Sequence, residues 1–170
     1  MMNKILESIR ERRSVRHFTN EPVPEEKVEK ILEAARWAPS GKNNQPWKFL
    51  VVREENKKSE IANCTHYSKT VNRAKVLIVV YLDNEKVYDR TKDIQSVGAC
   101  CQNIWLATHA LGLGAVWNGE ILNHKKCVEK ILETPESLEL MAIFCIGNPA
   151  ENPTSERIPL EDLLIENSNR

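Results

Sequence analysis

Three arginines and a serine lie close together near the amino terminus. The stretch RERRSVRHF places Arg12, Arg13 and Arg16 around Ser14. Guanidinium groups donate paired hydrogen bonds to phosphate oxygens, and a serine hydroxyl adds a neutral donor. The pattern indicates a site for a small anionic ligand. The alternative is a solvated helix end, which is the commoner reason for a run of charges.

Hydrogen-bonding groups gather again between a predicted helix and a predicted strand. Residues 38–47, APSGKNNQPW, carry the side chains of Ser40, Asn43, Asn44 and Gln45. Such side chains, together with free backbone amides, could bind the polar edge of a heterocycle. A turn that ends a helix uses the same residue types for conformational reasons. Composition leaves both interpretations open.

A third stretch, GLGAVWNGE at residues 112–120, combines three glycines with a tryptophan. Glycines let the backbone approach a flat ligand closely, and Trp117 could form one wall of its site. A tight connection from a helix to a strand, with a core tryptophan, explains the stretch equally simply.

Metal chemistry has one candidate set. Cys64 with His66, and His124 with Cys127, could together supply four zinc ligands. Nothing in the sequence brings the two pairs together, and we expect no metal site. The five cysteines are odd in number and form no disulfide framework, so we expect reduced thiols in a cytoplasmic protein.

Length and charge exclude several classes of protein. The 170 residues suit one domain, 1–170, and the 24 lysines and arginines balance 24 aspartates and glutamates. Without a net positive charge we expect no nucleic-acid partner. The longest apolar run, residues 76–82, is too short to cross a bilayer, and we expect no membrane partner.

Helical and strand patterns alternate along the chain. Asn3 is positioned to cap a first helix, and Pro24 fits the first turn of a second that ends near Pro39 and Gly41. Strands are predicted at WKFLVV, KVLIVVYL, GAVWNG and LELMAIFCI, and shorter helices at NKKSEIAN and HKKCVEKIL. The fold class is therefore α/β (α+β), with a mixed central sheet flanked by helices. Residues 148–170, rich in proline, are predicted to form an extended arm.

The most informative helix is predicted at residues 93–111. Apolar residues recur there at alternating three- and four-residue spacing, and most other positions are small or apolar. We expect a long buried central helix that is shared with a second subunit.

Taken together, four stretches resemble the nitroreductase family, FMN-dependent oxidoreductases whose flavin site lies at a homodimer interface. They are ILESIRERRSVRHF, VPEEKVEKILEAARWAPSGKNNQPWKFLVV, LATHALGLGAVWNGEIL and IGNPAENPTSERIPLED, and they follow one another in the family's order. The absence of a GxGxxG motif agrees with this resemblance, because the family does not bind its flavin through a Rossmann motif. Asn118 departs from the pattern, since an apolar residue is more usual there.

The resemblance implies a set of cofactor ligands. Arg12, Arg13, Ser14 and Arg157 would bind the FMN phosphate and ribityl chain, and Arg16 would reach the N1/O2 side of the ring. The partner subunit would supply Pro39, Ser40, Gly41 and Asn43, and backbone amides of Gly119 and Glu120 would lie near N5, which takes and returns hydride.

The function implied is an FMN-dependent oxidoreductase that takes hydride from NAD(P)H and reduces small electron-poor acceptors, nitroaromatics or quinones, in a ping-pong mechanism. No residue of the chain would be a covalent catalyst. The alternatives are a flavin-binding module for sensing or storage, without nicotinamide-dependent turnover, and a related family chemistry such as reductive dehalogenation.

Overall fold

A four-stranded antiparallel sheet forms the middle layer of the fold, in a computed structural model that describes residues 3–165. Its strand order is β1-β2-β4-β3. The strands are β1 (Trp47–Val52), β2 (Val76–Asp83), β3 (Gly114–Asn118) and β4 (Leu138–Gly147). All three strand pairings are antiparallel, and the parallel component within the described residues is a bridge between Ser14 and Ala115. The predicted class, α/β (α+β) with a helix-flanked sheet, is confirmed, and the sheet is antiparallel where a mixed one was predicted.

Strand β2 is buried along its whole length, as its unbroken apolar run predicted. Side chains alternate between the two faces of a strand, so one strand contributes to two cores. One core receives Val76, Ile78, Val80 and Leu82. The opposite core receives Leu77, Val79 and Tyr81.

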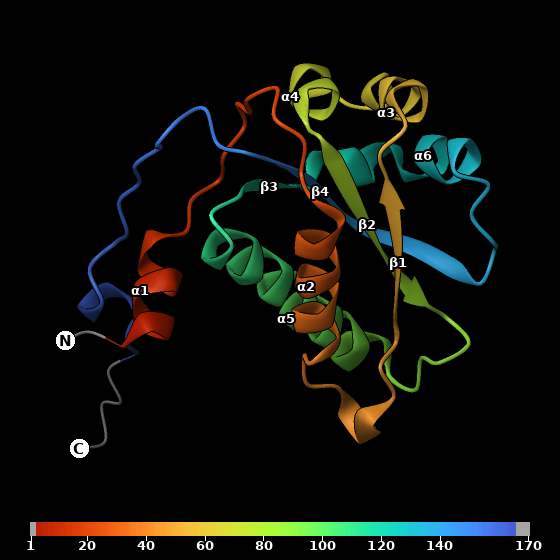
Figure 1. The fold of residues 1–170 in the computed structure, drawn as a ribbon. Helices are drawn as coiled ribbons and strands as arrows, with labels where there is room; N and C mark the ends of the chain where they lie inside the picture. Colours follow the sequence, from red (N-terminus) through yellow and green to blue (C-terminus); the bar gives the residue numbers. More distant parts are fainter. Residues whose placement is uncertain (1–2, 166–170) are drawn as a thin grey trace.

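Helices cover both faces of the sheet (Figure 1). Helices α2 (Glu25–Arg36) and α5 (Arg90–Ala110) pack against each other and against one core. The other core lies under α3 (Glu55–Ala62), α4 (Ser68–Arg73) and α6 (Lys125–Ile131). Short 3₁₀ turns complete the chain at η1 (Gly41–Asn43), η2 (Glu120–His124) and η3 (Glu161–Leu163).

The first helix and the described part of the carboxyl-terminal arm lie beside this three-layered body (Figure 1). Helix α1 (Lys4–Glu11) begins as predicted, because the Asn3 side chain accepts a hydrogen bond from the backbone N–H of Ile5. No residue of α1 is buried, and Ile5 and Leu6 are 67% and 57% exposed. The carboxyl-terminal arm runs without helix or strand from residue 150 to residue 160. The chain therefore leaves an apolar helix face uncovered.

Two features differ from the sequence interpretation. Helix α4 was not predicted, because Val71 is its one buried residue and its sequence shows no apolar period. The expectation of reduced thiols is wrong for Cys64 and Cys127, which form a disulfide across 63 residues. The fold packs the end of α3 beside α6 and so brings the two sulfurs together.

The remaining three cysteines are free and buried. Burial raises the pKa of the Cys100 and Cys145 thiols to about 12, so both are protonated and unreactive at neutral pH. None of the helices within residues 3–165 has the length and apolar character needed to cross a membrane.

Candidate functional site

The arginines and the serine of the amino-terminal motif share one cavity with Arg157, which comes from the carboxyl-terminal arm. The cavity is about 350 Å³ in volume. Its wall is formed by Arg12, Arg13, Ser14, Arg16, Trp105, Pro153, Thr154, Ser155 and Arg157. Helix α1 ends just before the motif, and Arg12 adopts an extended backbone that directs the chain toward β3. Two segments 145 positions apart in the sequence thus form a single basic site.

The charge in this cavity is only partly compensated by the chain, since Glu151 accepts a hydrogen bond from the backbone N–H of Arg16 at 2.5 Å. Within residues 3–165, no carboxylate forms an ion pair with any of its four arginines. The pKa of Arg12 lies below its usual value, mainly because the side chain is partly buried and further because of the positive charges of Arg157 and Arg13. The Nε atoms of Arg12 and Arg13 are buried without a hydrogen-bond partner. Unpaired donors and converging positive charge favour a bound anion.

Trp105 fixes the orientation of Arg12. The Arg12 guanidinium carbon lies 3.9 Å from the centre of the Trp105 ring, a cation–π contact. The Trp105 Nε1–H donates to the carbonyl of Ala115 on β3, at 3.2 Å, which holds the ring in place. Sequence reasoning missed Trp105. Its one signal was an aromatic residue within a helix of mostly small and aliphatic side chains.

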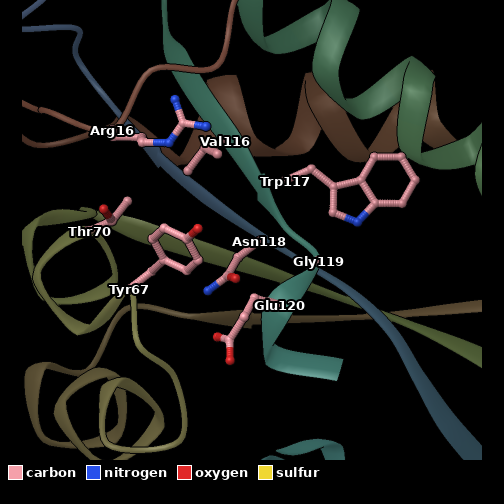
Figure 2. A pocket seen from close by; sticks show the side chains of 8 residues that line it. All are labelled: Arg16, Tyr67, Thr70, Val116, Trp117, Asn118, Gly119 and Glu120. Carbon is pink, nitrogen blue, oxygen red and sulfur yellow. The ribbon is translucent and has the colours of Figure 1, made fainter. Parts of the chain in front are cut away.

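A second pocket, about 150 Å³ in volume, adjoins the first at Arg16, which lines both. Figure 2 shows Arg16 on one side of it and Glu120 on the other, with Tyr67 and Asn118 between them. The pocket is lined by Arg16, Tyr67, Thr70, Val116, Trp117, Asn118, Gly119 and Glu120. Tyr67 and Thr70 were not singled out in the sequence, because they come from the unpredicted helix α4 and the turn before it.

The backbone at Gly119 is open to this pocket. No atom lies within 4 Å of the point where a Cβ would stand, so the chain's own packing does not require glycine there. The Oδ1 atom of Asn118, a residue only 5% exposed, has no hydrogen-bond partner. Trp117 contributes to the lining of the pocket, and its ring packs against Trp105 and Phe144, as the core interpretation predicted; its role toward a ligand stays a prediction.

The loop at residues 38–47 lines neither cavity within one chain. Its residues Pro39, Ser40, Gly41 and Asn43 lie between α2 and β1 (Figure 1). Local packing explains part of its composition, since the Ser40 Oγ accepts from the backbone N–H of Gln45 at 3.0 Å. A Cβ on Gly41 would stand 1.8 Å from the Tyr88 hydroxyl, so any larger residue there would have to displace the exposed Tyr88 ring.

Asn44, another donor that the sequence suggested, serves the fold. Its Nδ2 donates to the buried carboxylate of Asp93 at 2.7 Å. Asp93 also accepts from the backbone N–H groups of Tyr88 and Asp89. The asparagine therefore ties the loop to the start of α5.

The adjoining cavities suit one elongated ligand. An anionic group could bind among the arginines. A flat polar group could bind beside Gly119, where the backbone is open and the Oδ1 of Asn118 has no hydrogen-bond partner. Arg16, at the junction, would contact both parts of such a ligand.

Comparisons with known proteins give this geometry its context. The model of the Nitroreductase family matches residues 9–66 and 60–148. A protein of Methanothermobacter thermautotrophicus, assigned as an NADH dehydrogenase or NAD(P)H nitroreductase, is 36% identical over 151 residues, 88% of this chain and 79% of the relative.

Two solved structures extend the likeness to the fold. A Desulfovibrio desulfuricans protein, assigned as a nitroreductase and crystallised with FMN, is 45% identical, with a TM-score of 0.95 over 100% of both chains. The NADPH:FMN oxidoreductase of Vibrio harveyi, in complex with NAD⁺, is 27% identical, with a TM-score of 0.89 over 99% of this chain and 79% of its own. The chain belongs to the Nitroreductase family.

Proposed function

We propose that this chain is an FMN-dependent oxidoreductase that takes hydride from NAD(P)H and reduces small electron-poor acceptors, such as nitroaromatics or quinones, in ping-pong order. The observation that carries the proposal is a cavity of four arginines, none in an ion pair with a carboxylate of residues 3–165, joined through Arg16 to the open backbone of Gly119. Family membership supports it, and so do the FMN and NAD⁺ bound to the two similar structures.

The residues present fit the phosphate end of FMN. Arg12 and Arg13 hold buried Nε donors without partners, and Arg157 adds a third guanidinium to the same cavity. Charge-assisted hydrogen bonds to a phosphate would satisfy these donors and offset the repulsion from Arg157 and Arg13 that, after burial, lowers the Arg12 pKa. Ser14 would add a neutral donor toward the phosphate and the ribityl chain.

The second pocket fits the ring end. Bound FMN would supply the two-electron exchange, first with a nicotinamide and then with an acceptor. Arg16 would place a positive charge on the N1/O2 side, which favours the reduced cofactor electrostatically. The backbone amides of Gly119 and Glu120 would face the N5 edge, and the Asn118 Oδ1 would accept from N5–H once the flavin is reduced.

A second copy of the chain would complete the site. Pro39, Ser40, Gly41 and Asn43 line neither cavity in one chain, so the partner subunit would supply them. Lys42, Asn43 and Gln45 have φ angles of 53°, 54° and 47°, a strained conformation that is typical of binding loops. The loop is thus preorganised for contact outside its own chain.

Apolar surface supports the same homodimer. Trp37 is 73% exposed, and the apolar side chains of α1, Ile5, Leu6 and Ile9, are 67%, 57% and 47% exposed. A broad groove of about 520 Å³ between α1, α2 and α5 is lined by Lys4, Ile5, Ser8, Ala34, Trp37, Asn103, Leu106, Ala107 and Ala110. Covering so much apolar surface with a second copy would remove it from water. We infer further that residues 1–170 form one cytoplasmic domain, with residues 148–170 as its arm.

Anaerobic stopped-flow mixing tests the proposed activity. The FMN-loaded protein is mixed with NADH or NADPH, and the loss of flavin absorbance is followed. We expect at least one nicotinamide to bleach the flavin, and a quinone or nitroaromatic to restore its colour in a second mix. Flavin that stays oxidised with both nicotinamides, while dithionite bleaches it, would contradict the proposed turnover and support a storage or sensing role.

A further inference from the structure

The Cys64–Cys127 disulfide joins two segments that each present a histidine. His66 follows Cys64 by two residues, and His124 precedes Cys127 by three. The sequence alone gave no reason to expect the two segments to meet. In the folded chain the imidazole rings lie 6.3 Å apart between centroids, at an interplanar angle of 79°.

A carboxylate lies between these two rings. The Nε2 atoms of His66 and His124 are 3.9 and 3.8 Å from the same oxygen, Oε1 of Glu120. One ligand atom from each of the three side chains lies within 4.8 Å of the others. These distances are too long for hydrogen bonds, which join N and O at roughly 2.7–3.2 Å. The three atoms therefore converge without bonding one another.

Zinc–ligand distances are about 2.0–2.2 Å, so two ligands of a tetrahedral ion lie about 3.4 Å apart. The observed His–Glu separations exceed that value by a few tenths of an ångström. His66 and His124 have side chains that are 86% and 50% exposed, and small rotations of such side chains would close the difference.

The other oxygen of Glu120 is already held by the protein. Its Oε2 accepts from the Thr65 hydroxyl, and from the backbone N–H of His66 at 3.3 Å. These contacts leave Oε1 directed at the histidines, in the manner in which outer hydrogen bonds orient metal-binding carboxylates. The Thr65 hydrogen bond is also the main reason that the pKa of Glu120 lies below its usual value.

From this geometry we propose that His66, Glu120 and His124 form a binding site for a divalent transition-metal ion, most simply Zn²⁺, with its remaining positions open to solvent. Two imidazoles and one carboxylate are ligands that suit zinc. The site differs from the four-ligand set suggested by the sequence, because Cys64 and Cys127 are bonded to each other. Thr65 acts as a positioning residue through its hydrogen bond to Glu120.

The bound ion would connect the turn before α4 to η2. Tyr67, which lines the pocket beside Gly119, follows His66 directly, and its backbone N–H donates to the Thr65 hydroxyl. Metal binding would therefore stabilise one wall of that pocket without taking part in the cofactor chemistry.

Titration with Co²⁺, followed by displacement with Zn²⁺, tests the site directly. The full-length chain is used without a purification tag or reductant, after treatment with a chelator. A thiol assay under denaturing conditions should first find three free cysteines, as expected with the disulfide intact. We expect one Co²⁺ per chain, with visible cobalt bands and no thiolate-to-cobalt charge-transfer band.

Variants assign the ligands. His66→Gln and His124→Gln should each weaken Co²⁺ binding at least tenfold, and Thr65→Val by about 10- to 100-fold. His17→Gln is the matched control, because His17 lies at the same 3.9 Å from Glu151 but has no second histidine there. Its affinity should equal that of the wild type.

Three results would overturn the proposal. They are no Co²⁺ binding by the wild-type chain, unchanged affinity in both the His66 and His124 variants, and a thiolate charge-transfer band that identifies cysteine ligands. His66 is so exposed that its variant is expected to fold, which keeps the test decisive.

Discussion

Replacing Arg12 by alanine should weaken FMN binding far more than it weakens the fold. The Arg12 guanidinium is stacked on Trp105 and shares its cavity with Arg13 and Arg157. Loss of one charge-assisted contact to a phosphate costs about 1.5–3 kcal/mol. At about 1.4 kcal/mol for each factor of ten, the dissociation constant should rise by about 10- to 150-fold.

The stability of the cofactor-free protein should change little in this variant. Loss of the contact with Trp105 costs about 0.5–2 kcal/mol. Removing Arg12 also removes a partly buried charge that is repelled by Arg157 and Arg13, which offsets part of that cost. We therefore expect the free energy of unfolding of the apoprotein to stay within ~1 kcal/mol of the wild type, measured in urea.

The assay is fluorescence titration of apoprotein with FMN at fixed ionic strength. Arg10→Ala is the matched control, since it removes the same charge from the end of α1 but from a residue that does not line the cavity. Its dissociation constant should rise by less than about threefold, because the Arg10 side chain is exposed and its charge is screened by salt. Equal losses in both variants, or unchanged binding by Arg12→Ala, would refute a direct contact between Arg12 and the phosphate.

Two further predictions concern stability. The disulfide closes a loop of 63 residues, for which the chain-entropy model gives a stabilisation of about 4 kcal/mol. We therefore expect the double variant Cys64→Ser/Cys127→Ser to lose ~2–4 kcal/mol of unfolding free energy, measured in urea without reductant. An unchanged urea midpoint would refute the bond. Hydrogen bonding to Arg90, and to a lesser extent to Lys125, lowers the pKa of Glu139 from 4.5 to about 2. The ionised carboxylate therefore stabilises the fold fully above pH 4.5, and this contribution is lost as the pH falls through about 2. Glu139→Gln should therefore cost ~2–3 kcal/mol at pH 7 and almost nothing near pH 2; an equal cost at both values would refute the linkage.

Elements with strong local patterns could be predicted from the sequence. The apolar run of β2 and the recurring apolar residues of α5 each indicate a buried element. These patterns are local, so they can be recognised without knowing how the rest of the chain folds. Helix α4 carries no such pattern, because its place depends on one buried side chain, Val71. Its position could not be predicted, and neither could the role of Tyr67 beside it.

Contacts between residues far apart in the sequence could not be predicted from local patterns. Arg157 and Arg12 share a cavity. The family resemblance predicted that they would lie together, whereas no local pattern in the sequence did. The Cys64–Cys127 bond was missed because spacing along the chain says nothing about two segments that meet only when α3 packs against α6. The roles of Arg12, Arg157 and the other predicted FMN ligands stay predictions.

The cofactor content of the purified chain tests the central claim most directly. The protein is purified without added flavin, its visible spectrum is recorded, and the flavin released on denaturation is identified and counted against the protein. We predict a yellow protein that releases FMN, one per chain, and that rebinds it after removal. A colourless protein that cannot be reconstituted with FMN would contradict the assignment of the arginine cavity and the Gly119 pocket as a flavin site.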